Sequence, residues 1–359
     1  MSTAAGRQGR SEEAAAAGPR QPVMADVAAL AGVSHQTVSR VLNDHPNVRP
    51  ATRDRVLSAI RELGYRPNSA ARTLVTRKSN MLGVVSFDTT LFGPASMLYG
   101  IERAARAAGY YISIVSPRAL DARSVQEAVD RLRDQGVEGI VLIAPQTSAA
   151  DPLAHISVSV PVVRLGTSGQ VRVPTVAADN IAGARAATRF LLDLGHRTVH
   201  HVSGPPSWLE ARHRAESWSA TLADAGVAAP RPLPGDWSSR SGYEAGRQLA
   251  ADPDVTAVFC ANDHMALGLL WALHEAGRRV PEDISVVGFD DIPEASYLVP
   301  PLTTVRQDFG GLGRRGLELL VAQLDDTPDN RSGAPGSVLV APEMVVRLST
   351  APAPARSRA

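Results

Sequence analysis

The stretch MADVAALAGVSHQTVSRVLN, residues 24–43, has the spacing of two short helices joined by a tight turn. In its first half, Val27, Leu30 and Ala31 recur at the i, i+3, i+4 spacing of an apolar helix stripe. Gly32 can adopt the left-handed conformation that ends a helix, and Ser34 can cap the helix that follows. The stretch therefore predicts a helix-turn-helix.

The second of these helices separates an apolar face from a polar one. At about 100° per residue, Val38, Val41 and Leu42 fall on one side. The opposite side carries residues suited to a major groove, because arginine can bond guanine O6 and N7 and glutamine can bond adenine N6 and N7. The expected DNA-binding residues here are Ser34, His35, Gln36, Thr37, Ser39, Arg40 and Asn43. The alternative is a polar helix face with no partner but water.

A third helix is expected over residues 50–63, with Pro50 in its first turn and Gly64 closing it. It should complete the core of a small domain over residues 23–66, while residues 1–22 have the composition of a disordered arm. The side chains expected to be buried are Val56, Leu57, Ile60 and Leu63. Those expected on the solvated outer side are Arg53, Arg55 and Arg61.

The charge of the chain is unevenly distributed. The 359 residues sum to +1, but residues 1–80 carry 12 basic and 6 acidic groups and the remainder carries 25 basic and 30 acidic groups. A basic head on an acidic body indicates a polyanionic partner for the head alone. The longest apolar stretch, residues 139–144, is far shorter than the roughly 18 residues that a membrane span needs, so a cytoplasmic protein is expected. The single cysteine, Cys260, is expected to be a small buried hydrophobe.

From residue 81 onward, short apolar strands alternate with amphipathic helices, which predicts parallel sheets with right-handed crossovers. About 270 residues are too many for one sheet, so two α/β lobes are expected. The predicted strands are residues 81–87, 110–115, 139–143, 160–165, 198–202, 257–260 and 285–289. The predicted helices are residues 95–108, 125–135, 181–194, 212–225, 243–250 and 264–276.

GVSHQTVSRVLN, followed by ATRDRVLSAIRELGYRPNSAARTLVTRKSNMLGVV, resembles the head, hinge and first strand of the LacI/GalR family of bacterial transcriptional regulators. The resemblance extends from residue 23 to about residue 350. It implies an all-α head and a periplasmic-binding-protein-like body of two Rossmann-like lobes, with residues matching His35, Gln36 and Arg40 reading base edges. Arg49 departs from the serine that usually caps the third helix, at a cost of about 1 kcal/mol.

The resemblance also implies lobe boundaries and a hinge. The first lobe would take residues 80–177 and 306–335, and the second residues 178–305 and 337–350. Residues 67–79 would form a hinge helix that orders against its twin in the minor groove, with Asn68 and Ala71 near DNA and Leu74 wedged into a base step. The alternative is a linker in which Leu74 rests on the body.

The segments GDWSSRSGY, ANDHMALG, ISVVGFDD and PPLTTVRQDF resemble those of sugar-responsive family members. The effector contacts implied are Phe92, Pro94, Arg214, Trp237, Asn262, Asp290 and Gln307. An indole suits the CH face of a sugar, while carboxylate, amide and guanidinium groups suit its hydroxyls. Two alternatives remain: Asn262, Asp263, Asp290 and Asp291 are residue types that cap helices, and Arg214 and Asp290 can form a structural ion pair. The loop LFGPAS and the Gly166–Thr167 strand end depart from the galactoside-binding pattern, where an acidic residue is usual after the strand.

The sequence therefore predicts a cytoplasmic, nucleoid-associated regulator and not an enzyme. Its partners would be double-stranded operator DNA, a small sugar such as a galactoside, and a second copy of the chain. A dimer is expected and not a tetramer, because the tail at residues 351–359, which is expected to be flexible, lacks a tetramerising leucine heptad. Another sugar, a nucleoside or a phosphorylated sugar are alternative effectors, and a sugar-binding protein without gene control is an alternative function. No metal or cofactor is expected: the histidines at 196, 200 and 201 suit a structural role, and the GxGxxG at 311–316 lacks the context of a dinucleotide site.

Overall fold

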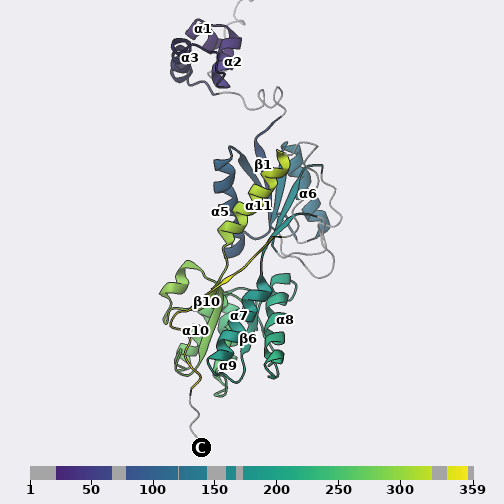
Figure 1. The fold of residues 1–359 in the computed structure, drawn as a ribbon, viewed down its shortest axis with the longest axis vertical. Coiled ribbons are helices and arrows are strands. Elements are labelled where there is room, and N and C mark those ends of the chain that lie inside the picture. The colour runs from purple at the N-terminus through teal and green to yellow at the C-terminus, as the bar shows by residue number, and fades with distance from the viewer. Residues whose placement is uncertain are drawn as a thin grey trace, which may run out of the picture. The chain divides into compact units, whose positions relative to one another are not determined.

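The computed structural model describes residues 22–66, 78–119, 121–143, 159–166, 173–325 and 338–354. The chain divides into two compact units, Met1–Ser79 and Asn80–Ala359, which we call the head and the body. Figure 1 shows the helical head and the two sheets of the body.

The described part of the head contains the helices α1 (Met24–Ala31), α2 (His35–Leu42) and α3 (Pro50–Leu63). Val27, Val38 and Val56, one from each helix, are fully buried and form the centre of its core. Gly32 and Gly64 have φ of 61° and 60°, so both helix ends use the left-handed conformation that glycine tolerates best. The predicted helix-turn-helix is confirmed.

Three details of the head differ from the sequence prediction. Leu30 and Leu57, expected in the core, are 47% and 38% exposed, and Ala59 is buried instead. The smaller side chain fits because α1 and α3 pack closely. Arg53 is not simply solvated: its guanidinium pairs with Asp44 and donates to the carbonyl of His45 at 3.1 Å, which ties α3 to the turn after α2.

The first lobe of the body is built on a parallel sheet of strand order β11-β5-β4-β3-β1-β2. Its strands are β1 (Met81–Ser86), β2 (Tyr111–Val115), β3 (Gly139–Ile143), β4 (Val162–Leu165), β5 (Thr175–Ala178) and β11 (Val338–Val340). Helices α5 (Phe92–Ala107) and α11 (Phe309–Leu324) pack on one set of strand side chains, and α6 (Ala122–Asp134) packs on the alternate set. Both faces of the sheet are therefore covered by helices.

The second lobe repeats this plan, with strand order β12-β10-β9-β8-β6-β7 and only β12 antiparallel. Its strands are β6 (His200–Ser203), β7 (Leu233–Pro234), β8 (Ala257–Cys260), β9 (Ser285–Asp290), β10 (Thr303–Arg306) and β12 (Glu343–Val345). Helices α9 (Ser239–Ala250) and α10 (Asp263–Glu275) cover one face, and α7 (Asn180–Asp193) and α8 (Leu209–Asp224) cover the other. A short 3-10 helix, η1 (Pro293–Tyr297), precedes β10. The predicted α/β body of two lobes is confirmed.

The chain passes between the lobes three times: after β5, after β10 and after β11. The expected boundary at residues 335–337 is wrong, because β11 pairs in parallel with β5 of the first sheet and the chain returns only afterwards. The tail was expected to be flexible from residue 351. However, the Ala351 carbonyl accepts a hydrogen bond from Ser285 Oγ, and the Ala353 amide donates to the Leu194 carbonyl at 2.9 Å. Residues 355–359 lie outside the described residues.

The GxGxxG segment lies within α11 and has a packing role. A Cβ at Gly313 would overlap the Met97 carbonyl of α5, and one at Gly316 would overlap the Leu165 side chain of β4. The spacing therefore lets α11 approach its neighbours closely, and does not form a turn between a strand and a helix. In the described ranges, no helix is long and apolar enough to cross a membrane.

Candidate functional site

Helix α2 presents the polar residues that were expected to bind DNA. The side chains of Ser34, His35, Gln36, Arg40 and Asn43 are exposed, while those of Thr37 and Ser39 are half-buried. Ser34 caps the helix, because its Oγ accepts a hydrogen bond from the Thr37 amide at 3.2 Å. This leaves His35, Gln36 and Arg40 in the first two turns as the long side chains free to reach a partner. The hinge residues Asn68, Ala71 and Leu74 lie outside the described residues.

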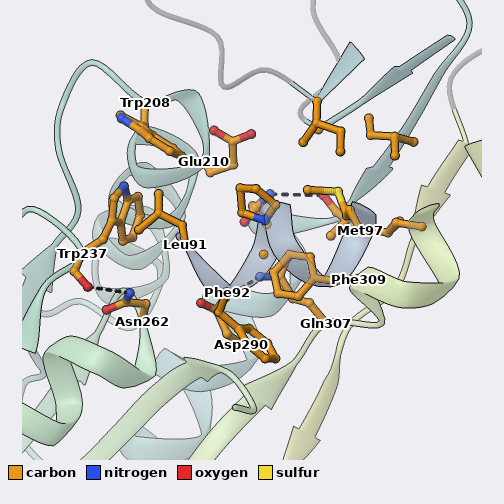
Figure 2. Close-up of a pocket in the computed structure, with 18 of the residues that line it drawn as sticks. Leu91, Phe92, Met97, Trp208, Glu210, Trp237, Asn262, Asp290, Gln307 and Phe309 are labelled. Carbon is orange, nitrogen blue, oxygen red and sulfur yellow. Dashed lines mark hydrogen bonds between the residues drawn. The ribbon is translucent and has the colours of Figure 1, made fainter. Parts of the chain in front are cut away.

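The body contains a cavity between its two lobes, with about 790 Å³ of space free of protein atoms and partly open to solvent. It lies beside the carboxyl ends of β8 and β9, where side chains and helix N-termini converge in parallel sheets. Figure 2 shows the side chains that surround it. All of the expected effector contacts line this cavity: Phe92, Pro94, Arg214, Trp237, Asn262, Asp290 and Gln307. The structure therefore brings them together.

Arg214 is at the centre of the polar wall. It lies in the second turn of α8, is 5% exposed, and its guanidinium lies over the Phe289 ring at 3.9 Å. Nε donates to Asn180 Oδ1 at 2.8 Å, and Nη1 donates to the Ala261 carbonyl and lies 3.7 Å from Asp290 Oδ1. The predicted ion pair with Asp290 is thus present, and it faces the cavity. The helix expected to start at residue 212 starts at Leu209, which places Arg214 in its second turn and not at its start.

Asp290 is the last residue of β9 and has φ of 113°, a backbone conformation that residues other than glycine rarely adopt. Its Oδ1 accepts a hydrogen bond from Gln307 Nε2 at 2.7 Å. Burial raises the pKa of Asp290 to about 6, although the Arg214 charge and the Gln307 amide act in the opposite direction. Strain of this kind is retained where the surrounding structure enforces it, often at functional sites.

Asn262 both caps a helix and faces the cavity. Its Oδ1 accepts from the Met265 amide at 2.9 Å, and its Nδ2 donates to the Trp237 carbonyl at 3.0 Å.

The two acids that neighbour the site in sequence, Asp263 and Asp291, have structural roles and do not line the cavity. Asp263 accepts hydrogen bonds from Thr304 and from the Ile292 amide, and Asp291 pairs with Arg306 and Arg347.

Trp237 forms the aromatic part of this wall. Its φ of 73° is again in the left-handed region, and its side chain is 8% exposed. A Cβ at Gly204 would overlap the Trp237 ring, so only glycine there lets the indole lie against the backbone. Trp237 Nε1 is buried and has no hydrogen-bond partner among the described residues.

The first lobe supplies an apolar wall. Phe92 and Phe309 meet edge to face with ring centroids 5.8 Å apart, and Leu91 and Met97 lie beside them. Phe92 and Pro94 belong to the first turn of α5, so the loop expected at residues 91–96 is instead mostly helix. The lining thus places apolar and aromatic surface opposite a cluster of hydrogen-bonding groups, which is the usual composition of a small-molecule site.

Several lining residues were not expected from the sequence. Trp208 and Glu210 lie at the start of α8, Asn180 begins α7, and His264 is in the first turn of α10. All four are at helix N-termini beside the ends of strands. A position at a helix N-terminus after a strand is the sequence signal that could have identified them as lining residues.

The remaining candidates are structural. His196 is hydrogen-bonded to Thr256 and Ser285, and His201 stacks between Trp218 and Phe259 with burial lowering its pKa to about 4. Cys260 is fully buried, as expected. No group of three or more potential metal ligands occurs within the residues that the structure places.

The sequence and the fold are both similar to those of known proteins. Residues 23–68 match the model of the bacterial regulatory proteins, lacI family, and residues 188–350 match the periplasmic binding protein-like domain. The lactose operon repressor of Escherichia coli (strain K12) is 35% identical over 298 residues, or 82% of this chain and 83% of that repressor.

Two solved structures extend the similarity to the whole architecture. The lac repressor dimer bound to operator and the anti-inducer ONPF has a TM-score of 0.83 and 32% identity, covering 92% of this chain and 100% of that one. The complex of the transcriptional regulator CelR with cellobiose has a TM-score of 0.66 and 33% identity, covering 91% and 99%. Together with the helix-turn-helix and the two-lobed body, these matches confirm that the chain belongs to the lacI family of bacterial regulatory proteins.

Proposed function

We propose that the protein is a transcriptional repressor that leaves a palindromic operator when a small sugar binds between the lobes of its body. The observation that carries this proposal is the cavity wall in which Trp237 stands beside Arg214, Asn262, Asp290 and Gln307. An indole face and a ring of hydrogen-bonding groups match the two chemical aspects of a sugar, its CH face and its hydroxyls. The lac repressor and CelR structures, with ONPF and cellobiose bound, support a sugar over a nucleoside or a phosphorylated sugar.

The first experiment is a thermal-shift screen of the full-length protein over lactose, cellobiose, ribose, a nucleoside and a sugar phosphate. A ligand at 100 times its dissociation constant adds roughly 2.7 kcal/mol of stability, which such a screen detects. Stabilisation by a sugar supports the proposal, and stabilisation by the nucleoside or the phosphate alone would replace the effector class. A binding protein without gene control would show the same shift but no affinity for operator DNA.

At the head, we propose that Arg40 and Gln36 read base edges while Ser39 and Asn43 contact phosphates. Asn68, Ala71 and Leu74 remain predicted minor-groove contacts. The regulator would act on the nucleoid in the cytoplasm.

Replacing Arg40 by alanine is expected to cost about 1–3 kcal/mol on an operator selected from a random duplex library, and little on random DNA. The reason is that a bidentate contact to guanine exists only at the correct sequence. Binding would be measured by fluorescence anisotropy at fixed salt. Arg55→Ala, exposed on α3, is the matched control and should affect both DNAs slightly and alike. Equal losses for Arg40→Ala on both DNAs would refute base reading.

Effector affinity is expected to fall as the pH drops below about 6. An ionised carboxylate can accept hydroxyl hydrogen bonds at both oxygens, whereas the protonated group can accept fewer, and burial raises the pKa of Asp290 to about 6. Affinity should therefore be constant above this pH and about tenfold lower one unit below it. Titration calorimetry from pH 5 to 8 measures the effect. Asp290→Asn should bind weakly with no such fall, and His264→Gln should keep it; an unchanged affinity at pH 5 would contradict the assignment.

We further propose a homodimer, in which two heads would meet two operator half-sites. Leu267 and Trp271, one turn apart on α10, are 38% and 57% exposed, and Tyr297 and Val299 are 84% and 92% exposed. Exposed apolar side chains of this size favour a protein partner. Sedimentation of the wild type should give a dimer, and Trp271→Glu should shift it toward monomer. A wild-type monomer or tetramer would contradict this prediction.

A further inference from the structure

One end of the cavity is lined by Trp208 and Glu210, which are not among the effector contacts expected from the sequence. Trp208 precedes α8, where its side chain makes no capping hydrogen bond, and Glu210 is the second residue of that helix. Both line the cavity. Figure 2 shows them on one side of it, with Asp290 and Gln307 on the other.

The two tryptophans offer a ligand aromatic surfaces of different orientation. Trp208 and Trp237 meet with ring centroids 5.6 Å apart and an interplanar angle of 70°. A pyranose stacks one CH face on one indole, so two indoles at this angle present their faces to different parts of a ligand.

Glu210 supplies an acceptor next to Trp208. It lies in the first turn of α8, where the helix dipole favours a carboxylate. Burial lowers the pKa of Arg214, and the negative charges of Asp290 and Glu210 partly oppose this effect. Glu210 therefore interacts electrostatically with Arg214 across the polar wall. In the described residues, the charged groups that line the cavity, Glu210, Arg214 and Asp290, all come from the second lobe. The first lobe has Gly166 at the end of β4 and offers no carboxylate there.

We propose that Trp208 and Glu210 form a second sugar subsite, so that the effector is a disaccharide. The inference rests on the proposed sugar-binding function. One ring stacks on Trp237 and bonds to the group of Arg214, Asn262, Asp290 and Gln307. The other stacks on Trp208 and donates hydroxyl hydrogen bonds to Glu210. An aryl glycoside would satisfy Trp208 but has no hydroxyls for Glu210.

The test measures the affinity of the full-length protein for four probes: cellobiose, lactose, glucose and galactose. Wild-type protein should bind one disaccharide at least about tenfold more tightly than either monosaccharide. Trp208→Ala and Glu210→Gln should each weaken that disaccharide about tenfold and change monosaccharide binding less than about twofold. Trp208→Phe should restore most of the affinity, because it keeps an aromatic face. Glu216→Gln, on the exposed side of the same helix, is the matched control.

The outcomes separate the two proposals. If Trp208→Ala weakens disaccharide and monosaccharide equally, or if wild type prefers a monosaccharide, the second subsite is wrong while the sugar effector stands. If Trp208→Ala weakens the disaccharide and Glu210→Gln does not, Glu210 makes no contact with the second ring and the subsite as proposed is wrong. If wild type binds none of the four probes, both the second subsite and the sugar proposal fail. Thermal melting of each variant without sugar shows that it is folded.

Discussion

Trp237→Ala is expected to lower effector affinity by at least about 100-fold, or about 2.8 kcal/mol, while operator binding in the absence of effector is kept. The substitution removes the stacking surface and the buried N–H donor from the polar wall. The head forms a separate compact unit with its own core, so its folding does not depend on the Trp237 side chain. Operator release would be followed by anisotropy as the stabilising sugar is added.

Gly204→Ala provides a second variant at the same site without removing the indole. The new methyl group would overlap the Trp237 ring and displace it from the backbone. Release should again be impaired, and more mildly, because a displaced indole keeps part of its stacking area. Gly226→Ala is not a suitable control, because Gly226 has φ of 73° and alanine would be strained there.

If Trp237→Ala still releases its operator at wild-type sugar concentrations, the cavity is not the effector site.

Arg214→Leu is expected to have the largest effect on stability, about 3 kcal/mol at pH 7.5. It leaves the Asp290 carboxylate without its buried partner and removes the donors to Asn180 and the Ala261 carbonyl. Loss of the Arg214 charge raises the pKa of Asp290 further, so the carboxyl takes up a proton at neutral pH. The loss should therefore be smaller at pH 5, where Asp290 is protonated in the wild type as well.

Urea unfolding of the body at pH 7.5 and pH 5 measures both effects. Arg212→Leu is the matched control: Arg212 lies on the same helix, its side chain is 41% exposed, and its ion pair with Glu216 spans 3.8 Å. A surface pair of this kind contributes at most about 1 kcal/mol. If Arg214→Leu were no more destabilising than Arg212→Leu, or if its effect were equal at both pH values, the buried pair would not have the assigned role.

The head was predictable because its signals are local. Within each helix, the spacing of apolar residues predicts a buried face, which includes Val27, Val38 or Val56. Gly32 and Ser34 mark a helix end and a cap. The errors at Leu30 and Leu57 arise from contacts that are not local in sequence. Their exposure depends on how closely helices distant in sequence approach one another, which periodicity does not encode.

In the body, most elements with strong apolar runs were predicted, whereas the short strands β5, β7, β10, β11 and β12 and the helix α11 were missed. β5 and β11 have only 4 and 3 residues and depend on their neighbours in the sheet, so nothing in their own sequence distinguishes them from loops. Helices α5, α8 and α9 begin earlier than expected, because Gly, Pro and Trp near their starts suggest a loop. These early starts matter, since they place Phe92, Pro94 and Glu210 on helices beside the cavity.

The candidate site was expected only through the family resemblance. Single residues such as Asn262 or Asp290 are ordinary caps or strand ends until the sheet aligns them, and Asn262 does act as a cap. Trp208 and Glu210 were missed because their partners, Trp237 and Arg214, meet them only in the folded lobe. A helix N-terminus that follows a strand in an α/β fold is the general signal that could find such residues.

In the proposed repressor, a ligand in the cavity and DNA on the head share one conformational equilibrium. Linkage requires this coupling to be reciprocal, typically by a factor of about 5–150. The direct test measures the affinity of the full-length protein for the sugar with and without a saturating selected operator, and its affinity for the operator with and without saturating sugar. Each ligand is expected to weaken the binding of the other by the same factor. Sugar affinity that is unchanged on the operator-bound protein would contradict it.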